Sequence, residues 1–311
     1  MAVSGVRMRW SELPAPVRAR IEEIIGDGPV VAAQSQAGGF SPGSADRVRT
    51  ASGRRAFVKA VSAAVNENAA RAARREHRNT AAMPVGVPVP RLIGGFDDGG
   101  WVALVLEDVA GATPRTPWRE TEIDAAVTAL RELESALTPA PLPGLPTAGE
   151  FVAPLFTGWD RIAADPPAGL GPWITGRLAD LRAAAAAGLA AVAAGGETML
   201  HADIRKDNLL VRPDGRVVVV DWPWSCVGPA WLDTVLLAAD VIIHGGDVER
   251  VLAGLDRRTA VRVITAVTGM YEDECRKPAP PGVPTLRAEQ RIWATALLGW
   301  LRNELPGDAR G

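Results

Sequence analysis

The sequence predicts an α+β fold in two lobes, a β-rich first lobe and a mainly α-helical second lobe. Between residues 29 and 106, short apolar runs alternate with glycine- and aspartate-rich turns, a pattern typical of an antiparallel sheet. After Gly111, apolar residues recur at helical spacing over longer segments. We therefore expect a first lobe over residues 1–108 and a second lobe over residues 109–311.

The first lobe is expected to begin with a helix and to continue into a five-stranded antiparallel sheet. Residues 11–25 place isoleucines on one helical face, and Gly26 follows as a stop signal. A charged helix over residues 66–83 is expected between the third and fourth strands. The expected strands are residues 29–36, 45–51, 55–61, 91–96 and 101–106.

The second lobe is expected to be helical apart from one hairpin. The segment Pro213-Asp214-Gly215 is a turn signal between two short segments expected to pair, residues 209–212 and 217–220. Residues 138–147 are proline-rich and are expected to form a loop. The expected helices are residues 120–137, 172–194, 231–243, 248–255, 258–274 and 285–305.

Composition excludes several classes of protein. The chain has 311 residues, 47% of them hydrophobic and 23% charged, with a net charge of −2, so neither disorder nor bulk binding of nucleic acid is expected. No apolar segment follows the N-terminus, and the alanine-rich stretch 183–194 indicates a soluble helix rather than a membrane span. We therefore expect a cytoplasmic protein with neither nucleic acid nor membrane as partner.

Lysine is almost absent from this chain. Only three of its 34 basic residues are lysine: Lys59, Lys206 and Lys277. Coding bias toward arginine explains the composition, but a lysine retained against that bias is a candidate for a specific role. The two cysteines are too few for a disulfide scaffold and lack the spacing of a metal site.

The most informative segment runs from His201 to Asp221. It contains His201-Ala202-Asp203, then Asn208 five residues after the aspartate, then Asp221 at the end of a β-branched run. A carboxylate in a loop can accept a proton from an attacking hydroxyl. Amide and carboxylate oxygens, as on Asn208 and Asp221, are ligands that Mg²⁺ accepts alongside phosphate oxygens. The pattern therefore favours phosphoryl transfer, which depends on a positioned nucleophile, metal and phosphates.

This segment resembles the catalytic and metal-binding motifs of the aminoglycoside phosphotransferase family, small-molecule kinases with a protein-kinase-like fold. The resemblance implies an ATP- and Mg²⁺-dependent phosphotransferase acting on a small-molecule hydroxyl. It implies Asp203 as catalytic base and Asn208 and Asp221 as metal ligands. It further implies that His201 orders the loop and that Arg205 neutralises charge near the transferred phosphate.

The resemblance extends into the first lobe. A lysine on the third strand, Lys59, would hold the α- and β-phosphates, and an acidic residue of the next helix would hold that lysine. Of the two candidates we prefer Glu76, because an acidic residue near the helix start, such as Glu67, is already favoured by the helix dipole. An intrahelical pair with neighbouring arginines is the alternative explanation for Glu76.

Two further segments are expected to bind the nucleotide. The glycine-rich turn containing Gly38, Gly39 and Ser41 would cover the phosphates, because glycine lets backbone N–H groups approach them. The segment from Glu107 to Val109 leaves the last strand of the sheet, where the resemblance places a hinge that binds adenine through its backbone.

Several residues of the second lobe are candidates for binding the acceptor, and the sequence does not select among them. Asp233 matches the family's buttress of the catalytic loop, although an acidic residue in a first helical turn is common. Acidic residues could attract a polycationic aminoglycoside, or they could form a solvated helix face. Trp293 and Trp300 lie on one helical face and could be core residues or stack on a ring. The acidic residues concerned are Asp240, Asp247, Glu272, Asp273 and Glu274.

The acceptor therefore stays open between an antibiotic and a metabolic alcohol or sugar. Two other functions are alternatives: a catalytically idle nucleotide-binding module that regulates a partner, and a protein kinase. The first is disfavoured because Lys59, Asp203, Asn208 and Asp221 are all present. The second is disfavoured because the Asp-Phe-Gly and Ala-Pro-Glu signatures of protein kinases are missing.

Overall fold

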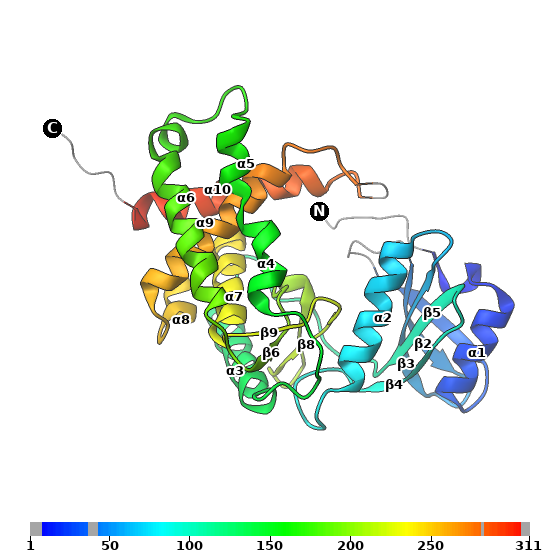
Figure 1. Ribbon diagram of the computed structural model, residues 1–311. Coiled ribbons are helices and arrows are strands. Elements are labelled where there is room, and N and C mark those ends of the chain that lie inside the picture. Colours follow the sequence, from blue (N-terminus) through cyan, green and yellow to red (C-terminus); the bar gives the residue numbers. More distant parts are fainter. Residues whose placement is uncertain (1–7, 37–42, 281–282, 306–311) are drawn as a thin grey trace. The chain divides into compact units, whose positions relative to one another are not determined.

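The computed structural model describes residues 8–36, 43–280 and 283–305 (Figure 1). Contacts divide the chain into two compact units, which are described separately. The first unit comprises residues 1–113, 207–225 and 281–284, and the second comprises residues 114–206, 226–280 and 285–311. A single cut after residue 108 does not reproduce this division, because residues 207–225 pack with the first unit.

The first unit is built on the five-stranded antiparallel sheet that the sequence predicts (Figure 1). Its order is β1-β2-β3-β5-β4, and every neighbouring pair is antiparallel. β5 lies between β3 and β4 and is almost fully buried, which fits its run of apolar residues. The strands are β1 (Val30–Ser35), β2 (Ser44–Thr50), β3 (Arg55–Ser62), β4 (Leu92–Asp97) and β5 (Trp101–Leu106).

Helices cover the two faces of this sheet. On one face, α1 (Ala15–Ile25) packs with Val58 and Ala60 of β3, and on the other α2 (Glu67–Ala81) packs with Val61. Because side chains alternate along a strand, Lys59 points to the α2 face. This alternation positions the lysine.

The first helix is shorter than expected. The structure has a 3₁₀ turn at Trp10–Glu12, and α1 begins only at Ala15, after Pro14. Proline lacks an N–H and is favoured at helix starts rather than within helices, so it separates the two segments.

A small hairpin completes the first unit. β7 (Leu209–Val211) pairs with β8 (Val217–Val219) as the turn signal predicts, after a 3₁₀ turn at Lys206–Asn208. The hairpin is tied to earlier chain by an Ala112–Val211 bridge and by Val219 N–H donating to the Pro88 carbonyl at 2.8 Å. These bonds explain why the segment packs with the first unit.

The second unit is mainly helical (Figure 1). A two-stranded sheet of β6 (Thr198–Leu200) and β9 (Cys226–Gly228) lies within it. Two of its helices, α4 and α5, lie in a segment for which no helix was predicted. The helices are α3 (Glu120–Ala136), α4 (Ala148–Phe156), α5 (Gly158–Ala164), α6 (Pro172–Ala193), α7 (Trp231–His244), α8 (Val248–Leu252), α9 (Arg257–Glu274) and α10 (Leu286–Glu304).

α9 is at the centre of the helical packing and contacts α5, α6 and α10. A Cβ on Gly158 would lie only 2.1 Å from the Gly269 carbonyl, so glycine is required for α5 to approach α9. Beside this contact, Trp159 Nε1 donates to the Thr265 carbonyl at 2.8 Å. Close packing and a satisfied indole N–H thus fix α5 against α9.

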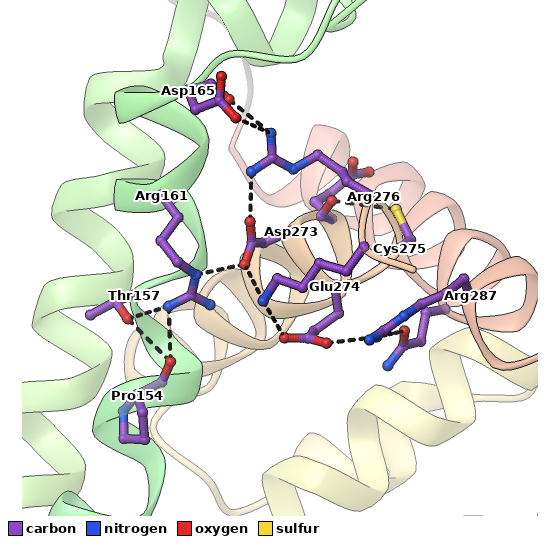
Figure 2. Close-up of polar contacts among 12 residues, drawn as sticks. Pro154, Thr157, Arg161, Asp165, Asp273, Glu274, Cys275, Arg276 and Arg287 are labelled. Atoms are coloured by element: carbon purple, nitrogen blue, oxygen red, sulfur yellow. Dashed lines mark hydrogen bonds and ion pairs between the residues drawn. The ribbon is translucent and has the colours of Figure 1, made fainter. Parts of the chain in front are cut away.

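The end of α9 carries a buried carboxylate surrounded by cations (Figure 2). Asp273 is only 1% exposed and accepts from Arg161 Nε at 2.6 Å, Arg276 Nη2 at 2.7 Å and Lys277 Nζ at 3.0 Å. Burial alone would raise the pKa of Asp273, but hydrogen bonds from Arg276, Arg161 and Lys277 outweigh it and lower the pKa to about 2. The network ties α5 to α9.

Replacing Asp273 with asparagine is expected to lower the free energy of unfolding by about 2 kcal/mol at neutral pH. The depressed pKa means that this stabilisation is present above about pH 4 and is lost as the pH falls toward 2. Urea unfolding of the wild type and of Asp273→Asn at a series of pH values measures the difference in their free energies of unfolding. The difference should shrink below pH 4, whereas a pH-independent difference, or one matched by Asp180→Asn on the exposed face of α6, contradicts the assignment.

Within the described residues, none of the helices combines the length and the apolar character needed to span a membrane.

Candidate active site

Three charged side chains meet in the first unit. Lys59 Nζ donates to both carboxylate oxygens of Glu76, at 2.7 and 2.9 Å, and to Asp221 Oδ1 at 2.5 Å. The side chain of Glu76 is 5% exposed and that of Asp221 is 44% exposed. One ammonium group thus connects a buried carboxylate to a partly exposed one.

Local structure fixes each member of this group. Asn66 directly precedes α2, and its side chain caps the helix by accepting from the Ala69 N–H at 2.9 Å. Ten residues later, Glu76 lies on the buried face of the helix. One turn beyond, Asn79 Nδ2 donates to the Trp222 carbonyl at 2.8 Å and so ties α2 to the residue after Asp221.

The three charges shift one another's pKa. Burial would lower the pKa of Lys59, but the carboxylates of Asp221 and Glu76 outweigh it and raise the pKa above its ordinary value. Burial, aided by the negative charge of Asp221, raises the pKa of Glu76 to about 7, although Lys59 opposes the rise. Lys59 is therefore a fixed cation, and Glu76 can change its charge near neutral pH.

Asn208 and Asp221 lie at the two ends of the β7–β8 hairpin. The Asn208 carbonyl accepts from the Val220 N–H at 2.9 Å, next to Asp221. Asn208 is buried, and Asp221 adopts a left-handed backbone conformation with φ of 70°. An amide and a carboxylate are oxygen donors that suit Mg²⁺, which takes few protein ligands and completes its shell with water and phosphate.

The described part of the chain contains no cluster of three or more His, Cys, Asp or Glu that could hold a metal ion.

The loop that follows β6 lies in the second unit and is held by Asp233 of α7. The Asp233 carboxylate accepts from the His201 N–H at 2.7 Å and from the Ala202 N–H at 2.9 Å. Ala202 has φ of 63°, so the loop turns sharply at this point. Burial raises the pKa of Asp233, while His201 and the two N–H donors oppose the rise.

This loop presents Asp203. His201 is fully buried, and its Nδ1 accepts from the Asp203 N–H at 3.2 Å. Arg205 Nη1 donates to Asp203 Oδ1 at 3.2 Å, and the side chains of Arg205 and Asp203 are 21% and 28% exposed. A buried imidazole orients the backbone of a partly exposed carboxylate that has a guanidinium beside it.

In the segment after β5, residues 107–109, some backbone N–H and carbonyl groups form hydrogen bonds within the described part of the chain and others do not. The Glu107 N–H donates to the Arg91 carbonyl at 2.9 Å, and the Val109 carbonyl accepts from Arg47. Among the described residues, neither the Glu107 carbonyl nor the Val109 N–H has a hydrogen bond. These two backbone groups lie two residues apart on the segment that follows β5.

Sequence reasoning missed what holds this segment. Asp108, whose side chain is 2% exposed, accepts from Arg47 Nε at 2.5 Å and Arg55 Nε at 2.7 Å. These arginines come from β2 and β3, and only the strand register brings them together. The glycine-rich turn cannot be compared in the same way, because Gly38, Gly39 and Ser41 lie outside the described residues.

Four of the five acidic residues considered for a cationic acceptor contact other residues of the second unit. Glu274 accepts from Lys277 and Arg287, both at 2.6 Å, and Asp240 from Trp118 Nε1 at 3.0 Å (Figure 2 shows Glu274 with Arg287). Asp247 caps α8 and lies 3.5 Å from Arg250, and burial raises the pKa of Glu272. With Asp273 held by its three cations, Asp240, Asp247, Asp273 and Glu274 all have partners within the second unit.

The structure thus brings some predicted site residues together within each unit. In the first unit, Lys59 contacts both Glu76 and Asp221. In the second unit, Asp203 contacts both His201 and Arg205. Neither Asn79 nor Asp108 was predicted. Asn79 could have been found, since it lies one helical turn from Glu76.

A family model matches most of the chain. Residues 39–266 match the phosphotransferase enzyme family. A search of curated protein sequences returns no significant match.

Solved structures with the same fold include several phosphotransferases. An aminoglycoside phosphotransferase from Alicyclobacillus acidocaldarius is 16% identical, with a TM-score of 0.53, and the match covers 94% of this chain and 98% of that one. The choline kinase LicA from Streptococcus pneumoniae is 13% identical, with a TM-score of 0.58 and coverage of 91% and 98%. Spectinomycin phosphotransferase, solved with ADP and spectinomycin, is 9% identical, with a TM-score of 0.61 and coverage of 92% and 98%. At these identities the likeness shows the kinase-like fold.

Proposed function

The chain belongs to the phosphotransferase enzyme family, and on that premise we propose that it transfers the γ-phosphate of ATP to a hydroxyl of a small molecule. The observation that carries the proposal is the contact of Lys59 with both Glu76 and Asp221. A lysine held by a buried glutamate on one side and a candidate metal ligand on the other is suited to binding nucleotide phosphates.

In this proposal Lys59 binds the α- and β-phosphates, and Glu76 keeps its ammonium group in place. Asn208 and Asp221 hold Mg²⁺, which when bound would neutralise charge on the phosphates. The glycine-rich turn with Gly38, Gly39 and Ser41 is proposed to cover those phosphates. The structure of solved relatives with bound ADP supports nucleotide binding by this fold.

Adenine is proposed to bind the segment after β5. The Glu107 carbonyl would accept from an exocyclic amine, and the Val109 N–H would donate to a ring nitrogen. Asp108, fixed by two arginines, keeps the backbone between them in place. Because the recognition uses backbone groups, side-chain identity at these positions matters little.

Asp203 is proposed to be the catalytic base. It accepts the proton of the acceptor hydroxyl as the phosphoryl group is transferred. His201 and Asp233 orient it through the hydrogen bonds of its loop, and Arg205 supplies a positive charge beside it. The division of roles between orienting groups and the base is typical of general base catalysis.

The acceptor is proposed to be a small alcohol that does not depend on an anionic surface for recognition. This is supported by the internal contacts of Asp240, Asp273 and Glu274, which leave little free negative charge in that part of the second unit. Polycationic antibiotics are therefore expected to have no advantage over choline, homoserine or sugars as acceptors.

ADP release from Mg-ATP tests the proposed function. The panel should include hygromycin B, spectinomycin, choline, homoserine and neutral sugars, with the Asp203→Asn variant as the blank. One acceptor should raise ADP release above that blank and gain a phosphoryl group in the mass spectrum. If no acceptor does so, and Asp203→Asn leaves nucleotide affinity unchanged, the protein is an idle nucleotide-binding module. Phosphorylation of a generic protein would instead indicate a protein kinase.

The raised pKa of Glu76 predicts a pH dependence of nucleotide use. Below about pH 7 its carboxyl is protonated and holds Lys59 less well, so kcat/KM for ATP should fall as the pH is lowered from 8 to 6. Glu76→Gln should lower kcat/KM by about tenfold and make it nearly independent of pH in this range. Retention of the wild-type pH profile by the variant would assign the titration to another group.

A further inference from the structure

Trp293 of α10 lies next to the proposed catalytic loop although it is ninety residues away in sequence. The guanidinium carbon of Arg205 is 6.0 Å from the centroid of the Trp293 ring, and the same guanidinium donates to Asp203 at 3.2 Å. We infer that Trp293 is a positioning residue that holds Arg205 beside Asp203. This inference rests on the proposed function.

Trp293 is itself held by α9. The ring of Tyr271 meets it edge-on, with centroids 5.2 Å apart and an angle of 66° between the planes. The start of α10 is tied to the end of α9, because Arg287 Nη1 donates to Glu274 at 2.6 Å (Figure 2). Arg291 Nη2 also reaches the Cys275 carbonyl at 3.4 Å. The pairing of two helices therefore fixes the ring that contacts Arg205.

A restraint of this kind matters because arginine is long and flexible. Ordering such a side chain costs conformational entropy, and a partly exposed ion pair such as that with Asp203 offsets only part of this cost. Contact of the guanidinium with an aromatic ring adds a further favourable interaction. Trp293 thus increases the fraction of time that Arg205 spends beside Asp203.

The expected consequence is a loss of turnover rather than of nucleotide binding. Arg205 acts where negative charge develops around Asp203 and the transferred phosphate, whereas ATP binding is proposed to depend on Lys59 and the backbone of Glu107 and Val109. Trp293→Leu should therefore lower kcat and leave KM for ATP unchanged. Trp293→Phe keeps an aromatic face and should restore most of the turnover.

The second unit provides a matched control. Trp173 of α6 lies under two other guanidinium groups, with Arg177 at 5.8 Å and Arg302 at 5.7 Å from its ring centroid. Trp173→Leu removes the same number of atoms and the same type of contact away from the catalytic loop. It reports what the loss of a cation–π contact does to stability alone.

The experiment measures basal ADP release from Mg-ATP, with water as acceptor, for the wild type and the three variants. In Trp293→Leu, kcat should fall about tenfold while KM for ATP stays within about twofold of the wild type. In Trp293→Phe, kcat should fall less than about threefold. Trp173→Leu should keep the activity of the wild type. Equal kcat for Trp293→Leu and Trp173→Leu would overturn the inference, as would a Phe variant no better than Leu.

A second measurement separates this inference from the proposed function. In a thermal double-mutant cycle of Trp293→Leu and Arg205→Ala, without nucleotide, the combined Tm loss should be smaller than the sum of the single losses by about 1 °C or more. Additive losses would show that the two side chains are not coupled. A coupled pair in a protein that releases no ADP with water or with any acceptor of the panel would refute the proposed function but leave the contact intact.

Discussion

Asp203→Asn is expected to lower kcat by about 10³-fold, while KM for ATP stays within about threefold of the wild type. Asparagine has nearly the shape of aspartate and can still receive the Arg205 guanidinium through its oxygen, so the loop is expected to keep its conformation. It cannot accept the proton of an attacking hydroxyl. The loss therefore falls on the transfer step rather than on nucleotide binding.

Initial rates of ADP release with the preferred acceptor measure this effect. Asp214→Asn is the control, because Asp214 is exposed in the β7–β8 turn and pairs with its sequence neighbours Arg212 and Arg216. It should leave kcat unchanged. Turnover of Asp203→Asn within about tenfold of the wild type would remove Asp203 from the role of base.

Lys59→Met is expected to lower kcat/KM for ATP by at least about 10²-fold, mostly through binding of the phosphates. The variant should also be less stable, because Glu76 would remain as a buried carboxylate without its cation, at a cost of about 3 kcal/mol. Replacing both residues, as Lys59→Met with Glu76→Leu, removes that unpaired charge. The double variant should regain stability but no activity.

This pair of variants separates a structural from a functional role of the lysine. Lys277→Met is the matched control, since Lys277 also contacts two carboxylates, those of Asp273 and Glu274. It should affect stability but not kcat/KM. Recovery of activity in the Lys59→Met/Glu76→Leu double variant would show that Lys59 acts only by neutralising Glu76.

The parts of the fold that the sequence predicts depend on local signals. Tight turns such as Ser52-Gly53-Arg54, together with strand alternation, predicted the five-stranded sheet. The resemblance to the aminoglycoside phosphotransferase family predicted a contact of Lys59 with an acidic residue of the following helix, and the structure contains the contact with Glu76. Short helices such as α4, after a proline-rich loop, had too few residues to show a helical period.

Contacts between distant segments could not be predicted. The acidic end of α9 was compatible with a solvated face or with a cationic acceptor, but Arg161 of α5 and Arg287 of α10 neutralise it. The same holds for Arg47 and Arg55, which reach Asp108 only through the strand register. Such pairs depend on which elements pack together, and one sequence does not specify that.

The most direct test of the central claim is transfer of label from γ-labelled ATP to a small-molecule acceptor in the presence of Mg²⁺. The account predicts a labelled phosphate ester on a hydroxyl of the acceptor, formed together with ADP by the wild type and not by Asp203→Asn. Label found only as inorganic phosphate with every acceptor, or an ester formed equally by Asp203→Asn, would contradict it.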